Sequence, residues 1–234
     1  MGEHIEEQVV APDADILVGV PCYKDGPMVD RCLQSLRDPM VQLLIVDNGS
    51  GPDVKQAIDS KGIVIRNDVN RYVNPAWNQI MQFFLDRPGR YDLLVIANSD
   101  LGMTAGWASK LRAHRSSHPQ EQIIFGKVGP ERSMGAFFAM TRRSVLACCP
   151  IPDDILIYGG DDFIFEVNRR VGFSETVAEG VTMTHAVSGT ISKSPELWEI
   201  GKPDNGCWHH HVLPNIVPKR VEEFLARHES VKST

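Results

Sequence analysis

The chain has 234 residues, of which 42% are hydrophobic, and a formal net charge of −6. This composition allows one sizeable core, and the pI of about 5.7 lacks the basic footprint typical of nucleic-acid-binding proteins. No stretch approaches the roughly 18 uninterrupted apolar residues of a membrane span, and the acidic N-terminus does not resemble a secretory signal. Five cysteines without a CxxC pair indicate reduced thiols, so we expect a cytoplasmic protein.

Short apolar runs alternate with helical patterns in the first half of the chain. The predicted strands are residues 16–20, 42–51, 62–68 and 92–100. The spacing of Val29, Leu33 and Leu36 predicts a helix that Pro39 stops, and a second helix at 75–87 begins with a proline. This alternation predicts a single α/β domain with a mostly parallel central sheet flanked by helices.

The second half is less regular. We predict a strand turning into a short helix at 133–146, a glycine turn and a helix at 157–172, and a strand leading into a loop at 178–190. An amphipathic helix is expected at 218–230, and residues 1–14 are expected to form a mobile leader. The first half therefore has the pattern of a nucleotide platform, and the second half is expected to complete the site.

Polar or acidic residues stand at the ends of four successive predicted strands. They are Pro21–Tyr23, Asp47–Ser50, Asn67–Asp68 and Asn98–Asp100. Ligands in open α/β sheets bind beyond the carboxyl ends of the strands, so these residues predict a site at one edge of the sheet. Each group taken alone also fits a turn or a helix cap. The sequence lacks GxGxxG, GxxxxGK[ST] and GxSxG, which leaves a dinucleotide fingerprint, a P-loop and a hydrolase elbow unsupported.

Four of these segments together resemble a known family. VGVPCYKD…LQSL, LIVDNGS, RNDVN and VIANSD, in this order and spacing, resemble the nucleotide-sugar half of GT-A-fold glycosyltransferases, particularly family 2. In the second half, IYGGDDFIFEVNRR is similar to the G-G-E-D-D segment of β-1,4-galactosyltransferases and to the E-D segment of family 2. The resemblance implies a GT-A-like, Rossmann-like catalytic domain over residues 15–190, with 15–105 as the nucleotide-sugar half and 106–190 as the acceptor and base half. The extension 191–234, with its terminal helix, has no counterpart.

The resemblance also implies donor-binding roles. Asp47 would accept a hydrogen bond from uracil or another base, in a pocket lined by Pro21 and Tyr23. Asn67 and the segment 69–78 would face the ribose and the sugar phosphate. The residues assigned in this way to the nucleotide-sugar donor are Pro21, Tyr23, Asp47, Asn48, Asn67, Asn98 and Ser99.

A divalent metal is implied by the D-x-D position of the family, where this chain has Asn98-Ser99-Asp100. Asp100 and His185 would hold Mn²⁺ or Mg²⁺, with histidine favouring Mn²⁺, and the cation would offset charge on the leaving diphosphate. Asn98 replaces the first acid, so we expect the cation to be held mainly by Asp100, His185 and the diphosphate. Two alternatives stay open: Asp100 as a turn former and His185 as a structural histidine.

The acidic pair Asp161 and Asp162 would supply the catalytic base. The resemblance gives this role to Asp162, and such a base implies inversion at the anomeric carbon. The alternative is that both acids cap the helix that follows them, because carboxylates are favoured at a helix N-terminus.

These assignments predict a metal-dependent inverting glycosyltransferase that uses a nucleotide sugar, with UDP as the expected nucleotide. Its acceptor would be a glycan, a small molecule or a hydroxymethylated DNA base, the last disfavoured by the net charge. One alternative is a sugar nucleotidyltransferase, although PCYKDGP has only Lys24 and Gly26 where a glycine-rich basic loop is needed. The other is a nucleotide-sugar-binding module with a decayed site, which Asn98 keeps open.

Two further signals are given structural interpretations. The run CWHHH at 207–211 lacks metal-ligand spacing and is interpreted as a surface or acceptor-cleft segment. Trp77, Phe83 and Phe84 lie at helical spacing and are predicted to belong to the core instead of a base-stacking platform.

Overall fold

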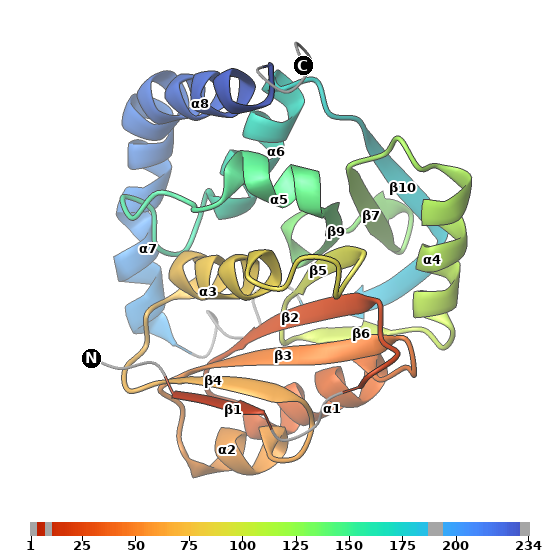
Figure 1. Cartoon of the computed structure of the whole chain (residues 1–234). Coiled ribbons are helices and arrows are strands. Elements are labelled where there is room, and N and C mark those ends of the chain that lie inside the picture. Colours follow the sequence, from red (N-terminus) through yellow and green to blue (C-terminus); the bar gives the residue numbers. More distant parts are fainter. Residues whose placement is uncertain (1–3, 8–10, 187–193, 230–234) are drawn as a thin grey trace.

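The structure, a computed structural model, describes residues 4–7, 11–186 and 194–229. Within these residues one sheet has the strand order β1-β4-β3-β2-β5-β9-β7-β10-β6, with β8 (Glu131–Arg132) paired to β7. At its centre β4 (Ile63–Asn67), β3 (Val41–Asn48), β2 (Ile16–Cys22) and β5 (Leu93–Ala97) run parallel (Figure 1). The predicted α/β fold with a parallel central sheet is confirmed.

The central strands are mostly apolar because helices cover both faces of the sheet (Figure 1). Side chains alternate along β3: Leu44 and Val46 pack on one face, and Leu43 and Ile45 on the other. The helices that contribute to the first face are α3 (Val73–Leu85), α5 (Arg142–Cys148), α6 (Gly160–Arg170) and α8 (Val217–Glu229). The second face is covered by α1 (Gly26–Leu36), α2 (Pro52–Ile58) and α4 (Trp107–Ser117).

The aromatic stripe of α3 belongs to the first of these cores. Trp77 and Phe83 are 4% exposed and Phe84 is fully buried. Trp77 meets Phe138 edge to face, with ring centroids 5.7 Å apart. The prediction of a core stripe is therefore confirmed.

The second half of the chain extends the sheet with mixed pairing. β9 (Phe137–Thr141) runs antiparallel between β5 and β7 (Ile123–Val128). β10 (Glu175–His185) is parallel to β7, and its end pairs antiparallel with β6 (Leu101–Met103), a strand that the sequence pattern did not reveal. A three-residue strand is too short to show a period. Its pairing nevertheless brings the end of β10 to the residues that follow β5.

The N-terminal segment differs from the expected mobile leader. Residues His4–Glu7 form β1, which pairs antiparallel with β4 at the edge of the sheet. An edge strand presents unpaired backbone N–H and C=O groups, and a segment of suitable composition can pair with them. The backbone of β4 is thus covered on its outer side.

The described part of the C-terminal extension, residues 195–229, is helical. α7 (Pro195–Cys207) continues through a π-helical segment (Trp208–Ile216) into α8. Trp208 is buried and the three histidines that follow it are exposed, in keeping with a surface segment. Among the helices of the described residues, none combines the length and the hydropathy that a bilayer span requires.

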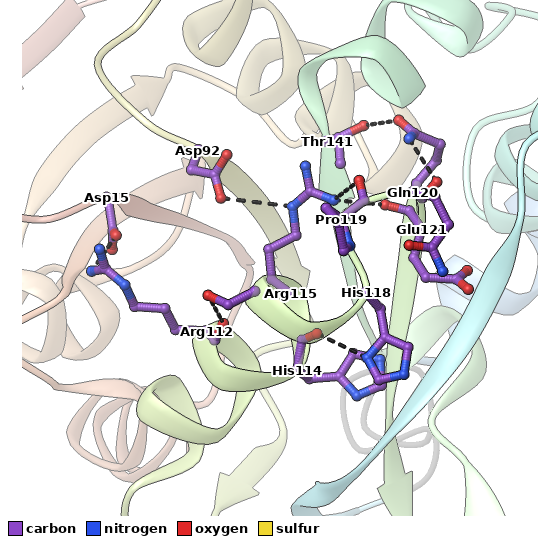
Figure 2. Close-up of polar contacts among 12 residues, drawn as sticks. Asp15, Asp92, Arg112, His114, Arg115, His118, Pro119, Gln120, Glu121 and Thr141 are labelled. Carbon is purple, nitrogen blue, oxygen red and sulfur yellow. Dashed lines mark hydrogen bonds and ion pairs between the residues drawn. The ribbon is translucent and has the colours of Figure 1, made fainter.

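Polar contacts fasten the C-terminal end of α4 to the sheet (Figure 2). The Arg115 guanidinium donates to the carbonyl oxygens of Pro119 and Glu121, at 2.6 and 3.1 Å. Its Nε lies 3.8 Å from a carboxylate oxygen of Asp92, which precedes β5. Because Asp92 stands at the amino end of the parallel strand β5, this network lies where the central strands begin, away from their carboxyl ends.

Candidate active site

A cavity of about 470 Å³ lies at the carboxyl ends of the central strands. This volume is in the range of small-molecule sites, and the position is the one where open α/β sheets bind ligands. We call one side the strand-end wall, formed by Pro21–Tyr23, Asn48 and Asn98–Asp100. A second group of lining residues, Ile157, Tyr158 and Asp161, is called the loop wall.

The cavity brings together most of the predicted site residues. Those that line it are Pro21, Tyr23, Asn48, Asn98, Ser99, Asp100, Asp161 and His185. Asp47, Asn67 and Asp162 do not line it. The prediction of one site at the carboxyl edge therefore agrees with the geometry, although three of its members lie behind or beside the cavity.

Asp47 is buried beneath the strand-end wall. Its Oδ1 accepts the backbone N–H of Ser50 at 2.9 Å, and its Oδ2 accepts from the Arg66 guanidinium at 3.1 Å. Alternation along β3 explains this position, since Asp47 follows Ile45 onto the α1 and α2 face while Asn48 follows Val46 onto the cavity side. In this structure Asp47 holds the turn after β3.

Asn67 supports Asn48 from behind. Its Nδ2 donates to Asn48 Oδ1 at 2.9 Å and to Gln79 Oε1 at 3.0 Å. Asn48 Nδ2 in turn donates to the carbonyl oxygen of Tyr72 at 3.1 Å. The two asparagines thereby fix the segment between β4 and α3, which contributes Tyr72 to the cavity lining.

Asp100 and His185 lie side by side at the cavity. Asp100 Oδ1 is 3.1 Å from His185 Nε2, and the side chains are 8% and 16% exposed. The pairing of β6 with β10 causes this proximity, because it sets His185 opposite Leu101 and joins the Ala186 N–H to the Asp100 carbonyl at 3.1 Å. Residues far apart in the sequence thus form one pair.

The pair fits a divalent cation whose coordination shell is completed by oxygens of a bound ligand. A carboxylate oxygen and an imidazole nitrogen suit Mn²⁺, and a diphosphate can supply further oxygens. Among the described residues, no group of three or more His, Cys, Asp or Glu side chains is placed to hold a metal ion.

The acidic pair starts α6. Gly159 precedes the helix with φ of 73°, a left-handed conformation that glycine adopts without strain. Asp161 packs so closely on Gly135 that a Cβ there would lie 2.2 Å from Asp161 Oδ2. Burial, and next the nearby Asp162, raise the pKa of Asp161. Asp162 is exposed.

Sequence reasoning missed several residues of the cavity lining. Arg132 contributes a cation; its guanidinium lies 3.1 Å from Glu175 and stacks on Phe125 at 4.5 Å. Tyr158 belongs to the loop wall, and Leu197 comes from α7. The available signal for Tyr158 was its place directly before the two glycines of the acidic motif. Arg132 and Leu197 lie in segments without a recognisable pattern.

Comparison with known families gives one match. A family model described as glycosyl transferase family 2 matches residues 17–133, half of the chain. The matched segment includes the whole strand-end wall and Arg132, and it ends before the loop wall. No curated protein matches the chain.

Solved structures share the fold at low sequence identity. The mannosyltransferase PcManGT from Pyrobaculum calidifontis, in complex with GDP-Man and Mn²⁺, is 13% identical with a TM-score of 0.58, over 94% of this chain and 75% of that one. Glucosyl-3-phosphoglycerate synthase from Mycobacterium tuberculosis, with Mn²⁺, UDP and phosphoglyceric acid, is 16% identical with a TM-score of 0.58, over 82% and 76%. S. aureus TarS is 13% identical with a TM-score of 0.61, over 92% and 72%.

Proposed function

Because the chain belongs to glycosyl transferase family 2, we propose that it is a metal-dependent inverting enzyme that moves a sugar from UDP to an acceptor hydroxyl. The observation that carries this proposal is the Asp100–His185 pair, which lies on one cavity with the strand ends and the acidic start of α6. Donor and metal functions each have a candidate group in the cavity lining, and the candidate base Asp162 follows Asp161 of that lining in the sequence.

Asp100 and His185 are the proposed metal ligands. A divalent cation bound by them, Mn²⁺ or Mg²⁺, would act as a Lewis acid that offsets charge on the leaving diphosphate. His185 must be neutral to bind through Nε2, and Asp100 must be ionised. Asn98 and Ser99 adjoin this pair in the strand-end wall, where they would contact the donor.

The base must accept a proton from an acceptor that arrives from solvent. Asp162 meets this requirement because it is exposed, whereas Asp161 packs on Gly135 in the cavity wall. We therefore keep the base role for Asp162 and assign Asp161 to the donor sugar. As the acceptor oxygen bonds to the anomeric carbon, the bond from that carbon to the diphosphate oxygen breaks, and the hydroxyl proton passes to Asp162.

The nucleotide would lie against the strand-end wall. Pro21, Tyr23 and Asn48 line the part of the cavity nearest the ends of β2 and β3, and Tyr72 closes it from the start of α3. A UDP donor is proposed here, and GDP is the competing choice because one similar structure contains GDP-Man. A glycan or small-molecule acceptor is favoured over nucleic acid by the net charge of −6.

Calorimetric titration tests this proposal. We expect UDP to bind more tightly with Mn²⁺ than without it, and UDP-sugars to be hydrolysed slowly in the presence of the metal. Absence of UDP and GDP binding would overturn the assignment. Metal-independent UDP binding without donor turnover would instead favour a nucleotide-sugar-binding module, the alternative that Asn98 suggests.

A panel of nucleotide sugars sharpens the donor assignment. UDP-linked and GDP-linked sugars are compared at equal concentration for metal-dependent hydrolysis, with EDTA-treated protein as the control. Faster turnover of the UDP series is expected, and preference for GDP-mannose would correct the nucleotide.

A further inference from the structure

The loop wall is held by a helix from outside the matched family segment. Residues 155–158 carry no regular secondary structure, and they lead directly into Gly159, Gly160 and the acidic pair. Their backbone polar groups must still be satisfied, because Ile155 and Ile157 are buried. The partners come from two distant helices, α3 and α7.

Asp204 of α7 holds the N–H groups of this segment. The side chain is 3% exposed, and its Oδ2 accepts from the backbone N–H groups of Leu156, Ile157 and Tyr158 at 3.2, 2.7 and 2.9 Å. A carboxylate that accepts successive backbone N–H groups makes charge-assisted hydrogen bonds, which are stronger than neutral ones. One side chain thus fixes three consecutive peptide groups.

Asn74 of α3 holds the carbonyl groups of the same segment. Its Nδ2 donates to the carbonyl oxygens of Ile155 and Tyr158 at 3.1 and 3.2 Å. Its backbone N–H donates to the carbonyl oxygen of Leu156 at 2.9 Å. Two side chains on opposite sides therefore take the place of a strand ladder for this wall.

The Tyr158 ring is seated on the same side of α7. Trp198, Gly201 and Asp204 are spaced three residues apart, which places them along one side of the helix. A Cβ on Gly201 would lie 2.7 Å from Tyr158 Cε2, so the ring rests where only glycine leaves room. Trp198 meets the ring edge to face, with centroids 6.3 Å apart.

We propose that Asp204 is a positioning residue for sugar transfer, which clamps residues 156–158 to α7 and so fixes Tyr158 and the acidic start of α6 against the donor. This inference rests on the proposed function. It adds that the C-terminal extension completes the active site, although α7 lies outside residues 17–133 that define the family match. Asp204 itself does not line the cavity.

The test compares Asp204→Ala and Asp204→Asn in the full chain. Loss of the carboxylate frees three N–H groups, and a displacement of about 1 Å at a reacting group can cost about 100-fold in rate. We expect Asp204→Ala to lower kcat by about 100-fold with unchanged UDP–Mn²⁺ affinity, because the metal pair and the strand-end wall lie on other elements. Asp204→Asn keeps one acceptor oxygen and should be intermediate.

Thr141→Ala is the matched control for lost stability. Thr141 is buried, and its hydroxyl caps α5 by accepting the Ser144 N–H at 3.3 Å, at the edge of the sheet opposite the cavity. The substitution Thr141→Ala should lower the melting temperature and leave kcat unchanged. An equal loss of kcat in Thr141→Ala at a similar melting temperature would reduce Asp204 to a stability role and overturn the proposal.

Hydrogen exchange separates this inference from the proposed function. Amide protection at 156–158 should fall in Asp204→Ala and stay at the parent level in Thr141→Ala. Unchanged protection there, or an unchanged kcat, would overturn the clamp. A parent protein that turns over no nucleotide sugar would overturn the proposed function instead, and the exchange measurement would still decide whether Asp204 holds the loop.

Discussion

The two walls of the cavity are built in different ways. The strand-end wall stands on parallel strands, whose hydrogen-bond ladders fix where β2, β3 and β5 end. The loop wall stands on side-chain bonds from Asn74 and Asp204 to an irregular backbone. Backbone hydrogen bonds repeat along the whole length of a paired strand, whereas the loop wall depends on two side chains. A single side-chain substitution should therefore displace the backbone of the loop wall more than that of the strand-end wall.

This difference also separates the chemistry. The strand-end wall carries the groups proposed to bind the donor and the metal, which would need a rigid platform and act in binding. The loop wall leads to Asp162, the proposed base, which would act in the chemical step. Substitutions in the strand-end wall are expected to change mainly UDP–Mn²⁺ affinity, and substitutions in the loop wall mainly kcat. The predictions below test that division.

The largest expected effect is at the base. Asp162→Asn removes the proton acceptor and should lower kcat by about 100-fold to 10,000-fold, while UDP–Mn²⁺ affinity stays unchanged. Steady-state kinetics and UDP titration of the same preparation measure both. Asp154→Asn, an exposed acid in the preceding loop, is the control. If Asp162→Asn turns over normally and Asp161→Asn does not, the base is Asp161.

The metal pair tests the strand-end wall. Loss of an outer-shell partner alone costs about 10–100-fold in metal affinity, so removal of a direct ligand in Asp100→Ala should cost at least that much. The expected readout is loss of the Mn²⁺-dependent gain in UDP affinity, with UDP binding in EDTA unchanged. Asp68→Ala removes an exposed acid at the same sheet edge as a control. Retained Mn²⁺ dependence in Asp100→Ala would make Asp100 a turn residue.

The same contrast decides what could be predicted from the sequence. Apolar runs revealed the central strands, and polar residues at their ends indicated the cavity, because both follow from the parallel ladder. The resemblance assigned Asp47 to the base, whereas alternation along β3 places it away from the cavity, on the α1 and α2 face. His185 was assigned beside Asp100 by resemblance, whereas the cause of their contact is the pairing of β6 and β10.

Asp204 had no signal in the sequence. Its partners are backbone N–H groups of residues 156–158, which any amino acid except proline provides, so no residue pattern marks the contact. The helix that bears it also lacks a counterpart in the resemblance. Side-chain bonds to irregular backbone depend on tertiary structure alone.

A smaller effect is expected on stability from Asp161, the half-buried acid of the loop wall. Burial raises the pKa of Asp161 above its ordinary value of 3.8, so the folded state binds this proton more tightly than the unfolded chain. The stability that this group contributes is present below pH 3.8 and lost as pH rises through the raised pKa, because the ionised carboxylate is poorly solvated in the folded state. Asp161→Asn removes that cost.

Thermal melts measure this prediction. Asp161→Asn should raise the melting temperature at pH 7 by about 2–4 °C for each kcal/mol gained, and the gain should shrink as pH is lowered toward 4. The same variant should raise the donor KM, because Asp161 is assigned to the sugar. A lower melting temperature at pH 7 would mean that the helix N-terminus needs the charge more than burial opposes it.

The smallest effect is expected away from both walls, at the end of α4 shown in Figure 2. The His114 and His118 rings stack with centroids 4.3 Å apart. Burial, and next His118, lower the pKa of His114 below 6.5, and Glu121 opposes them. A lowered folded pKa means that stability is present above pH 6.5 and is lost as pH falls through the lowered pKa. The melting temperature of the parent protein should therefore fall slightly between pH 7.5 and 5.5, and the melting temperature of His114→Gln should fall less.

The histidine pair also provides a control for the cavity. Because His114 and His118 lie at the amino ends of the strands, away from the cavity, UDP–Mn²⁺ affinity of His114→Gln and of the parent should change equally with pH. A selective change in that affinity in His114→Gln would couple the network to the cavity and break the separation between the site and the rest of the sheet.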